Sequence, residues 1–130
     1  NTNCLHIVDY KSTSQKSDKG PITLDDLWKA SYKRQMDLYV WVLSKKGFHV
    51  DNMGYFLYCD GDRFSDYDFL SSNMASMNFK MTLIEYQTNQ SWIEPTLNEI
   101  KDCLHESKRP SHSDRCEYGK FLTQSLNERA

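Results

Sequence analysis

The amino-acid sequence predicts an α/β fold with a small mixed central sheet flanked by helices. Three observations predict it: short β-branched and aromatic runs that suit strands, longer stretches whose apolar residues recur every three or four positions, and a chain order of β, α, β, β, α, α. Of the 130 residues 38% are hydrophobic and 26% charged, so size and composition suit one folded domain over residues 1–130. We expect the chain to fold without disulfides or a structural metal.

The first half of the chain is expected to hold one strand and one long helix. Residues 4–10 read Cys-Leu-His-Ile-Val-Asp-Tyr, which predicts a buried strand that ends near Lys11, before a polar loop that runs to residue 20. A helix over residues 27–43 follows, and Gly47 lies where a left-handed C-terminal cap belongs. The apolar and aromatic positions of this helix recur at helical spacing: Trp28, Tyr32, Met36, Tyr39 and Leu43.

The second half is expected to hold two strands and two helices. Residues 53–59 are apolar and aromatic, and residues 78–87 alternate between apolar and polar, so these segments predict a pair of strands joined by a long loop. Ser91 and Glu94 have the spacing of a capping box at the start of a helix that carries Ile93, Leu97 and Leu104 on one face. A last helix is expected from about residue 117 to residue 126.

Charge, cysteine content and hydropathy exclude several classes of protein. The formal net charge of -2 gives no overall attraction to a polyanion, so contact with nucleic acid would need local groups of basic residues. The four cysteines have no CxxC spacing, which argues against a zinc ribbon and a disulfide framework and favours reduced thiols in the cytoplasm. No apolar run reaches the roughly 20 residues that a membrane span needs, so no membrane partner is expected. The basic groups in question are Lys33, Arg34, Lys45 and Lys46.

The first predicted strand carries a candidate catalytic pair, Asp9 and Lys11. Residues two apart on a strand project from the same face, and here they lie at the end where the loop begins. The Asp9 carboxylate could hold magnesium together with the adjacent backbone carbonyl of Tyr10, and Lys11 could orient a water or stabilise charge on a phosphate. The alternative is a strand that simply ends in polar residues.

The long helix carries a second candidate pair, Gln35 and Tyr39. Residues four apart are neighbours on one helical face. An amide both donates and accepts hydrogen bonds, and a tyrosine offers a hydroxyl beside a stacking surface, so the pair could support a catalytic carboxylate or touch a nucleic-acid strand. The alternative is a half-exposed helical face without a function.

Together, the strand Ile-Val-Asp-Tyr-Lys-Ser, the polar loop and the helix with Arg-Gln-Met-Asp-Leu-Tyr resemble the RecB-like branch of the PD-(D/E)XK nuclease superfamily, from Leu5 to the end of the chain. The resemblance implies a restriction-endonuclease-like fold. It also implies that Asp9 ligates the metal, that Lys11 is the catalytic lysine, and that Gln35 and Tyr39 support the site or contact DNA. The expected activity is Mg²⁺- or Mn²⁺-dependent hydrolysis of phosphodiester bonds in single- or double-stranded DNA, with DNA repair as one setting.

The chain departs from the family in two ways. The family's first metal-binding acidic residue lies on an upstream strand, and nothing precedes Asn1, so we expect the N-terminal part of the domain, and with it part of the site, to be missing. Missing strands would expose a sheet edge, which favours a homodimer or pairing with that segment. Some members bind an iron-sulfur cluster through four cysteines, but only Cys116 remains in the closing region, with Gly119 where another would stand, so no cluster is expected.

Other groupings carry weaker signals. His105 and His112 lie near Cys103 and Cys116, but their spacings match no standard zinc pattern. Four aspartates after the second strand lack the closing glutamate of a calcium loop, so a solvated acidic turn is expected. A second function also fits the sequence, namely a noncatalytic nucleic-acid-binding or protein-interaction module that retains the nuclease fold. The four aspartates are Asp60, Asp62, Asp66 and Asp68.

Overall fold

The computed structural model describes residues 3–16, 18–64, 72–108, 110–113 and 115–128. The chain divides into two compact units, Asn1–Ile93 and Glu94–Ala130. The α/β class and the mixed sheet expected from the sequence are confirmed, whereas the single domain over residues 1–130 stays a prediction. The elements in chain order are β1 (Val8–Thr13), the 3₁₀ turn η1 (Leu27–Lys29), α1 (Ala30–Lys45), β2 (Met53–Gly61), β3 (Phe79–Gln87), α2 (Ile93–His105) and α3 (Glu117–Asn127).

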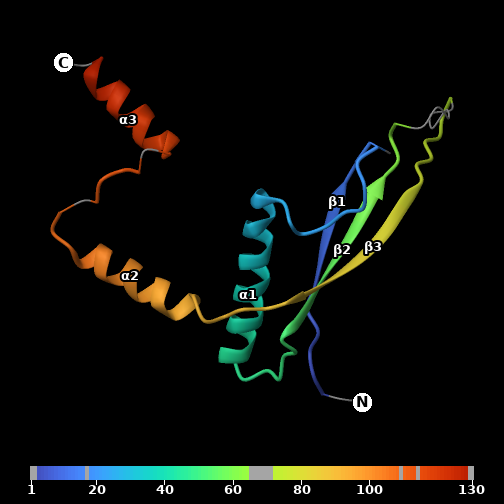
Figure 1. Ribbon diagram of the computed structural model, residues 1–130, viewed down its shortest axis with the longest axis horizontal. Helices are drawn as coiled ribbons and strands as arrows, with labels where there is room; N and C mark the ends of the chain where they lie inside the picture. Colours follow the sequence, from blue (N-terminus) through green and yellow to red (C-terminus); the bar gives the residue numbers. More distant parts are fainter. Residues whose placement is uncertain (1–2, 17, 65–71, 109, 114, 129–130) are drawn as a thin grey trace. The chain divides into compact units, whose positions relative to one another are not determined.

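The first unit contains a three-stranded sheet in the order β1-β2-β3 (Figure 1). Strand β1 runs parallel to β2, and β3 runs antiparallel to β2. A parallel pair needs a crossover connection, and α1 lies within it. The register places Asp9 opposite Phe56 and Lys11 opposite Tyr58, so the two candidate catalytic residues stand beside the centre of β2.

The first strand is displaced from its predicted position. The prediction of a strand over residues 4–10 is wrong in its bounds, because β1 begins at Val8 and continues to Thr13, while Leu5 forms only an isolated bridge with Val50. Strand β2 extends to Gly61, so its Cys59 and Asp60 pair with Ser12 and Thr13. These two polar residues therefore belong to β1. Asp9 and Lys11 therefore lie within the strand rather than at its end.

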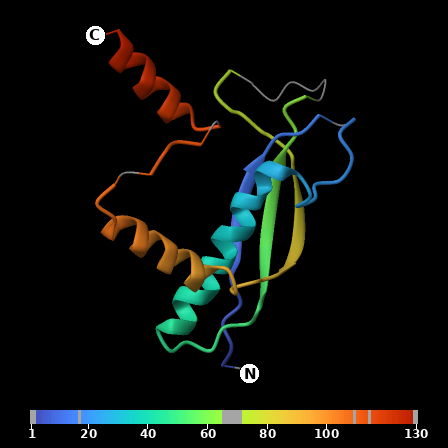
Figure 2. The ribbon, with the colours of Figure 1, turned by 60° about the vertical axis from the view of Figure 1, so that its left-hand side comes forward.

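Helix α1 covers one face of the sheet (Figure 2). Met36 on α1 and Phe56 on β2 are both fully buried, and they form a core cluster with Leu24 and Tyr58. Gly54 permits this approach, because a Cβ atom there would lie 2.6 Å from Met36 Cγ. Since side chains alternate along a strand, Asp9 and Lys11 share the face that this helix covers.

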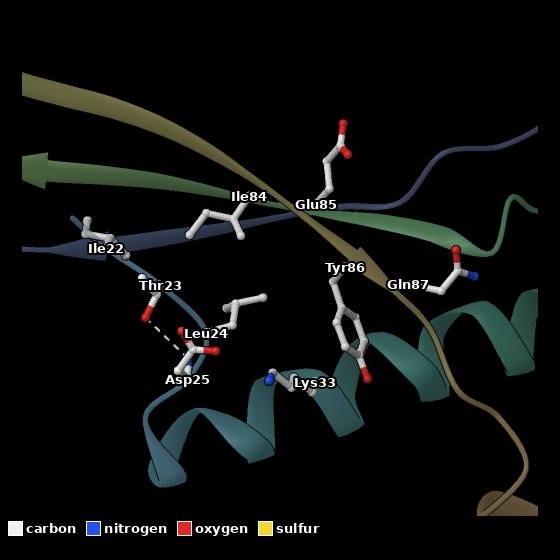
Figure 3. A pocket seen from close by; sticks show the side chains of 9 residues that line it. All are labelled: Ile22, Thr23, Leu24, Asp25, Lys33, Ile84, Glu85, Tyr86 and Gln87. Atoms are coloured by element: carbon white, nitrogen blue, oxygen red, sulfur yellow. Dashed lines mark hydrogen bonds between the residues drawn. The ribbon is translucent and has the colours of Figure 1, made fainter.

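Strand β3 shows the same alternation at close range (Figure 3). The side chains of Ile84 and Tyr86 point toward α1, whereas Glu85 points away from it. The loop with Leu24 lies beside β3 and α1, and an open cavity of about 510 Å³ remains between these segments. The covered face is therefore closed by apolar side chains at its centre and left open at the β3 edge.

A buried carboxylate joins α1 to the segment that follows β3. Asp37 is 3% exposed and accepts hydrogen bonds from the backbone N–H of Asn89 and from Trp92 Nε1, both at 2.9 Å. The Tyr86 hydroxyl donates to the same carboxylate at 3.4 Å. Burial, together with Asp37, raises the pKa of Tyr86 to about 12.

The long predicted helix is confirmed in type and nearly in extent. It begins with the 3₁₀ turn at Leu27 and continues as α1 to Lys45. Gly47 has a φ of 88°, which is the left-handed conformation expected of the residue that ends the helix. Strand β2 and strand β3 also agree with their predicted segments, because local periodicity in these regions coincides with what the sheet buries.

The second unit contains the two predicted C-terminal helices. Helix α2 carries exposed apolar side chains at Leu97, Ile100 and Leu104, which lie on one face by their spacing. Helix α3 begins after Cys116, whose Sγ accepts a hydrogen bond from the backbone N–H of Gly119 at 3.3 Å. Within the described ranges no helix combines the length and apolar character that crossing a membrane requires.

Candidate active site

The four residues singled out from the sequence form one connected group on the covered face of the sheet. Lys11 Nζ lies 2.8 Å from Asp9 Oδ2 and donates a hydrogen bond to Gln35 Oε1 at 3.0 Å. Gln35 Nε2 in turn donates to the Tyr39 hydroxyl at 2.6 Å. Asp9 and Lys11 are neighbours because they lie two residues apart on a strand, and Gln35 and Tyr39 because they lie four apart on a helix. The packing of α1 on the sheet brings the two pairs into contact.

Burial strengthens the electrostatics of this group. The side chains of Asp9 and Lys11 are 14% and 16% exposed, so little water screens the charges. Asp9 Oδ2 is buried, and the Lys11 ammonium at 2.8 Å compensates its charge. A buried charge needs such compensation, because little water is present to solvate it.

Two tyrosines that the sequence analysis assigned no role surround Lys11. The Tyr32 ring lies 4.2 Å from Lys11 Nζ in a cation–π contact. Tyr58 stands opposite Lys11 on β2, and its hydroxyl is buried without a partner among the described residues. Tyr32 precedes Gln35 by three residues, so helical spacing could have identified it, whereas only the strand register identifies Tyr58.

Tyr10 contributes no side chain to this group. It is 59% exposed and projects from the opposite face of β1, as its place between Asp9 and Lys11 requires. A hydrogen bond with the Cys59 side chain raises the pKa of the Tyr10 hydroxyl, with desolvation as a smaller cause. Any ligation of a metal by Tyr10 would therefore involve its backbone carbonyl.

Among the described residues, Asp9 is the carboxylate beside Lys11 that could bind a divalent cation. Mg²⁺ keeps several waters and is commonly bound through one or two carboxylates together with substrate phosphates, so Asp9 and the Tyr10 carbonyl suit the protein side of a sparse site. In the part of the chain that the structure describes, no group of three or more His, Cys, Asp or Glu side chains could hold a metal ion. Since Lys11 occupies Asp9 Oδ2, a cation would share that oxygen or bind through Oδ1.

Two of the remaining candidate residues, Asp60 and Cys116, have a role in local structure. Asp60 Oδ1 accepts a hydrogen bond from the backbone N–H of Gln15 at 2.8 Å and so joins the ends of β1 and β2. Asp66 and Asp68 lie outside the described residues. His112 Nδ1 lies 3.7 Å from Cys116 Sγ, and the cysteine also caps α3.

Comparison with known proteins gives no relative for this chain, since no family model, no curated protein and no solved structure matches it. The candidate site therefore stands on its own geometry, and the resemblance to RecB-like nucleases remains an expectation.

Proposed function

We propose that this chain belongs to a metal-dependent nuclease of restriction-endonuclease-like fold that hydrolyses phosphodiester bonds of DNA. The observation that carries the proposal is the connected group of Asp9, Lys11, Gln35 and Tyr39, in which the Asp9 and Lys11 side chains are largely buried. The RecB-like resemblance implies that Gln35 and Tyr39 support the site or contact DNA, and their hydrogen bonds connect them to Lys11. Asp9 and Gln35 both hold the Lys11 ammonium. A strand that only had a structural role would not need a buried lysine in such a fixed position.

Each residue has a separate task in this proposal. Asp9 holds the cation, with the Tyr10 carbonyl beside it. Lys11 stabilises negative charge as it develops on the phosphate and orients the attacking water, while Gln35 fixes the position of the Lys11 ammonium. Tyr39 holds the Gln35 amide by accepting its N–H. When bound, Mg²⁺ or Mn²⁺ supplies Lewis-acid polarisation of a phosphoryl oxygen.

The test is manganese-dependent cleavage of labelled single- and double-stranded DNA by the longest natural form of the protein. Asp9→Ala and Lys11→Ala should each lower the cleavage rate by at least about 100-fold, the scale of lost charge stabilisation. Asp102→Ala and Lys101→Ala remove the same side-chain types from exposed positions and should leave the rate unchanged. Equal rates in Asp9→Ala and Asp102→Ala would refute the assignment.

The sparse metal site favours a second candidate function, a noncatalytic module that binds nucleic acid or another protein on the same fold. Its supporting observation is that the described residues bring only one carboxylate to Lys11. The two candidates differ in metal binding: calorimetric titration with Mn²⁺ should show Asp9-dependent heat for a nuclease and none for a noncatalytic module.

We also propose that the protein binds DNA and acts in the cytoplasm. A second copy of the chain is proposed to form a homodimer by pairing with the exposed side of the sheet. β1 and β3 are the edge strands of the sheet, and the face opposite α1 exposes apolar side chains. Sedimentation velocity should then give a dimer mass, and a monomer at all concentrations would exclude the pairing. The exposed apolar residues are Val8, Tyr10, Phe79, Met81 and Leu83.

A further inference from the structure

A polar cavity of about 410 Å³ lies where β1 ends and η1 begins. Its charged lining residues are two lysines and one aspartate, so it carries one net positive charge in a chain whose formal net charge is -2. Such a local excess of positive charge attracts anions even where the whole chain does not. The lining residues that matter below are Ser14, Lys19, Asp26, Trp28, Lys29 and Tyr58.

Tyr58 lines this cavity with a buried side chain. The side chain is 3% exposed, and its hydroxyl has no partner among the described residues. Burial raises the pKa of Tyr58, and the nearby Tyr32, Asp9 and Asp26 raise it further, so the hydroxyl keeps its proton at neutral pH. An unpaired buried donor costs about 1–3 kcal/mol, a cost that a bound acceptor would remove.

Lys29 supplies a fixed positive charge. Its side chain is buried, at 6% exposed. Its ammonium contacts Asp26 Oδ2 at 2.8 Å and the Thr23 carbonyl at 2.7 Å, which uses two of its three protons. The ammonium also lies 5.1 Å from the centre of the Trp28 ring and 5.7 Å from that of Tyr58, so its position is fixed without the entropic cost of ordering a mobile side chain.

Trp28 adds an aromatic surface to the same cavity. Its side chain is 60% exposed, which is unusual for the largest apolar residue and leaves area on which a base can stack. Its ring also packs edge-on against Tyr32 at 5.4 Å, and Tyr32 covers Lys11. The cavity therefore adjoins the Asp9 and Lys11 pair through Tyr32 on one side and Tyr58 on the other.

We propose that this cavity binds one nucleotide of the DNA strand, with the phosphate beside Lys29 and Tyr58 and the base against Trp28. The identity of the ligand as DNA rests on the proposed nuclease function, whereas the affinity of the cavity for a nucleoside phosphate is a separate property. A phosphate fits a buried cation, a neutral hydroxyl donor and the nearby Lys19. A nucleotide held here would position the neighbouring phosphodiester at Lys11.

The experiment is a titration of the full chain with thymidine 5′-monophosphate in EDTA, followed by calorimetry and by quenching of tryptophan fluorescence. Thymidine and inorganic phosphate are titrated in parallel. The nucleotide should bind, and Tyr58→Phe should weaken it about tenfold, the effect of losing a buried hydrogen bond to a charged group. Trp28→Ala should weaken it by a similar factor through lost stacking. Tyr118→Phe, at a position 82% exposed, is the matched control and should bind as the unaltered chain does.

Three results would overturn the inference: no binding of the nucleotide, equal binding by Tyr58→Phe in a chain with unchanged circular dichroism, or binding of inorganic phosphate as tight as that of the nucleotide. Asp9→Ala separates this site from the chemistry, because in EDTA it should bind the nucleotide normally while failing to cleave DNA with Mn²⁺. Cleavage without nucleotide binding would remove the cavity proposal alone. Nucleotide binding without cleavage would support the proposed nucleotide site and refute the proposed nuclease activity.

Discussion

Replacement of Asp37 by alanine should strongly destabilise the first unit. The Asp37 carboxylate accepts two hydrogen bonds of 2.9 Å, from the Asn89 backbone N–H and from Trp92 Nε1, and a longer one from Tyr86. A hydrogen bond to a charged group contributes about 1.5–3 kcal/mol, and donors left without a partner add to the loss. Asp37→Ala should therefore lower the free energy of unfolding by about 3–5 kcal/mol, a large part of the roughly 5–15 kcal/mol typical of a domain.

Guanidinium unfolding followed by far-ultraviolet circular dichroism measures this loss, since the signal does not depend on Trp92. Asp37→Asn keeps the shape but turns an amide donor toward the existing donors, so it should cost about 1–3 kcal/mol. Asp102→Ala, an exposed aspartate on α2, should change stability by no more than about 0.5 kcal/mol. A loss below about 1 kcal/mol for Asp37→Ala would show that the carboxylate does not join α1 to the segment after β3.

Three further predictions concern the site, the packing and pH. Gln35→Leu removes the acceptor 3.0 Å from Lys11 Nζ and should slow DNA cleavage about tenfold in a kinetic assay while calorimetric Mn²⁺ affinity stays unchanged. Gly54→Ala places a Cβ 2.6 Å from the fully buried Met36 and should cost about 1–3 kcal/mol in denaturant unfolding. The pKa of Tyr86 is raised from 10.0 to about 12, so its stabilising contribution is complete below about pH 10 and falls as the pH rises toward 12. Urea unfolding of Tyr86→Phe should lose less stability over that interval than the unaltered chain does.

Each of these three has a result that would contradict it. Faster or equal cleavage by Gln35→Leu would mean that Lys11 needs no partner on α1. A Gly54→Ala variant as stable as the original chain would mean that Met36 can move away from β2 at no cost, against the close packing of the core. Parallel alkaline destabilisation of the Tyr86→Phe variant would assign that pH dependence to another group.

Much of the fold could be predicted because its patterns are local. The alternation at residues 78–87 and the helical spacing from Trp28 to Leu43 both coincide with elements of the structure. Local pattern failed at the first strand, where the mostly apolar residues 4–7 precede β1 and the polar Ser12 and Thr13 belong to it. The reason is that backbone pairing with β2 determines where β1 ends, and this pairing cannot be predicted from the hydropathy of the strand.

The sequence by itself determined the two pairs within the candidate site. Asp9 and Lys11 share a face because strands repeat every two residues, and Gln35 and Tyr39 are neighbours because helices bring residues four apart together. Only the tertiary structure decided that Lys11 meets Gln35, 24 residues away, and that Tyr58 stands opposite Lys11. Those contacts follow from burying Met36 against Phe56 and from the register of β1 on β2, which depend on the whole sheet rather than on any local stretch of chain.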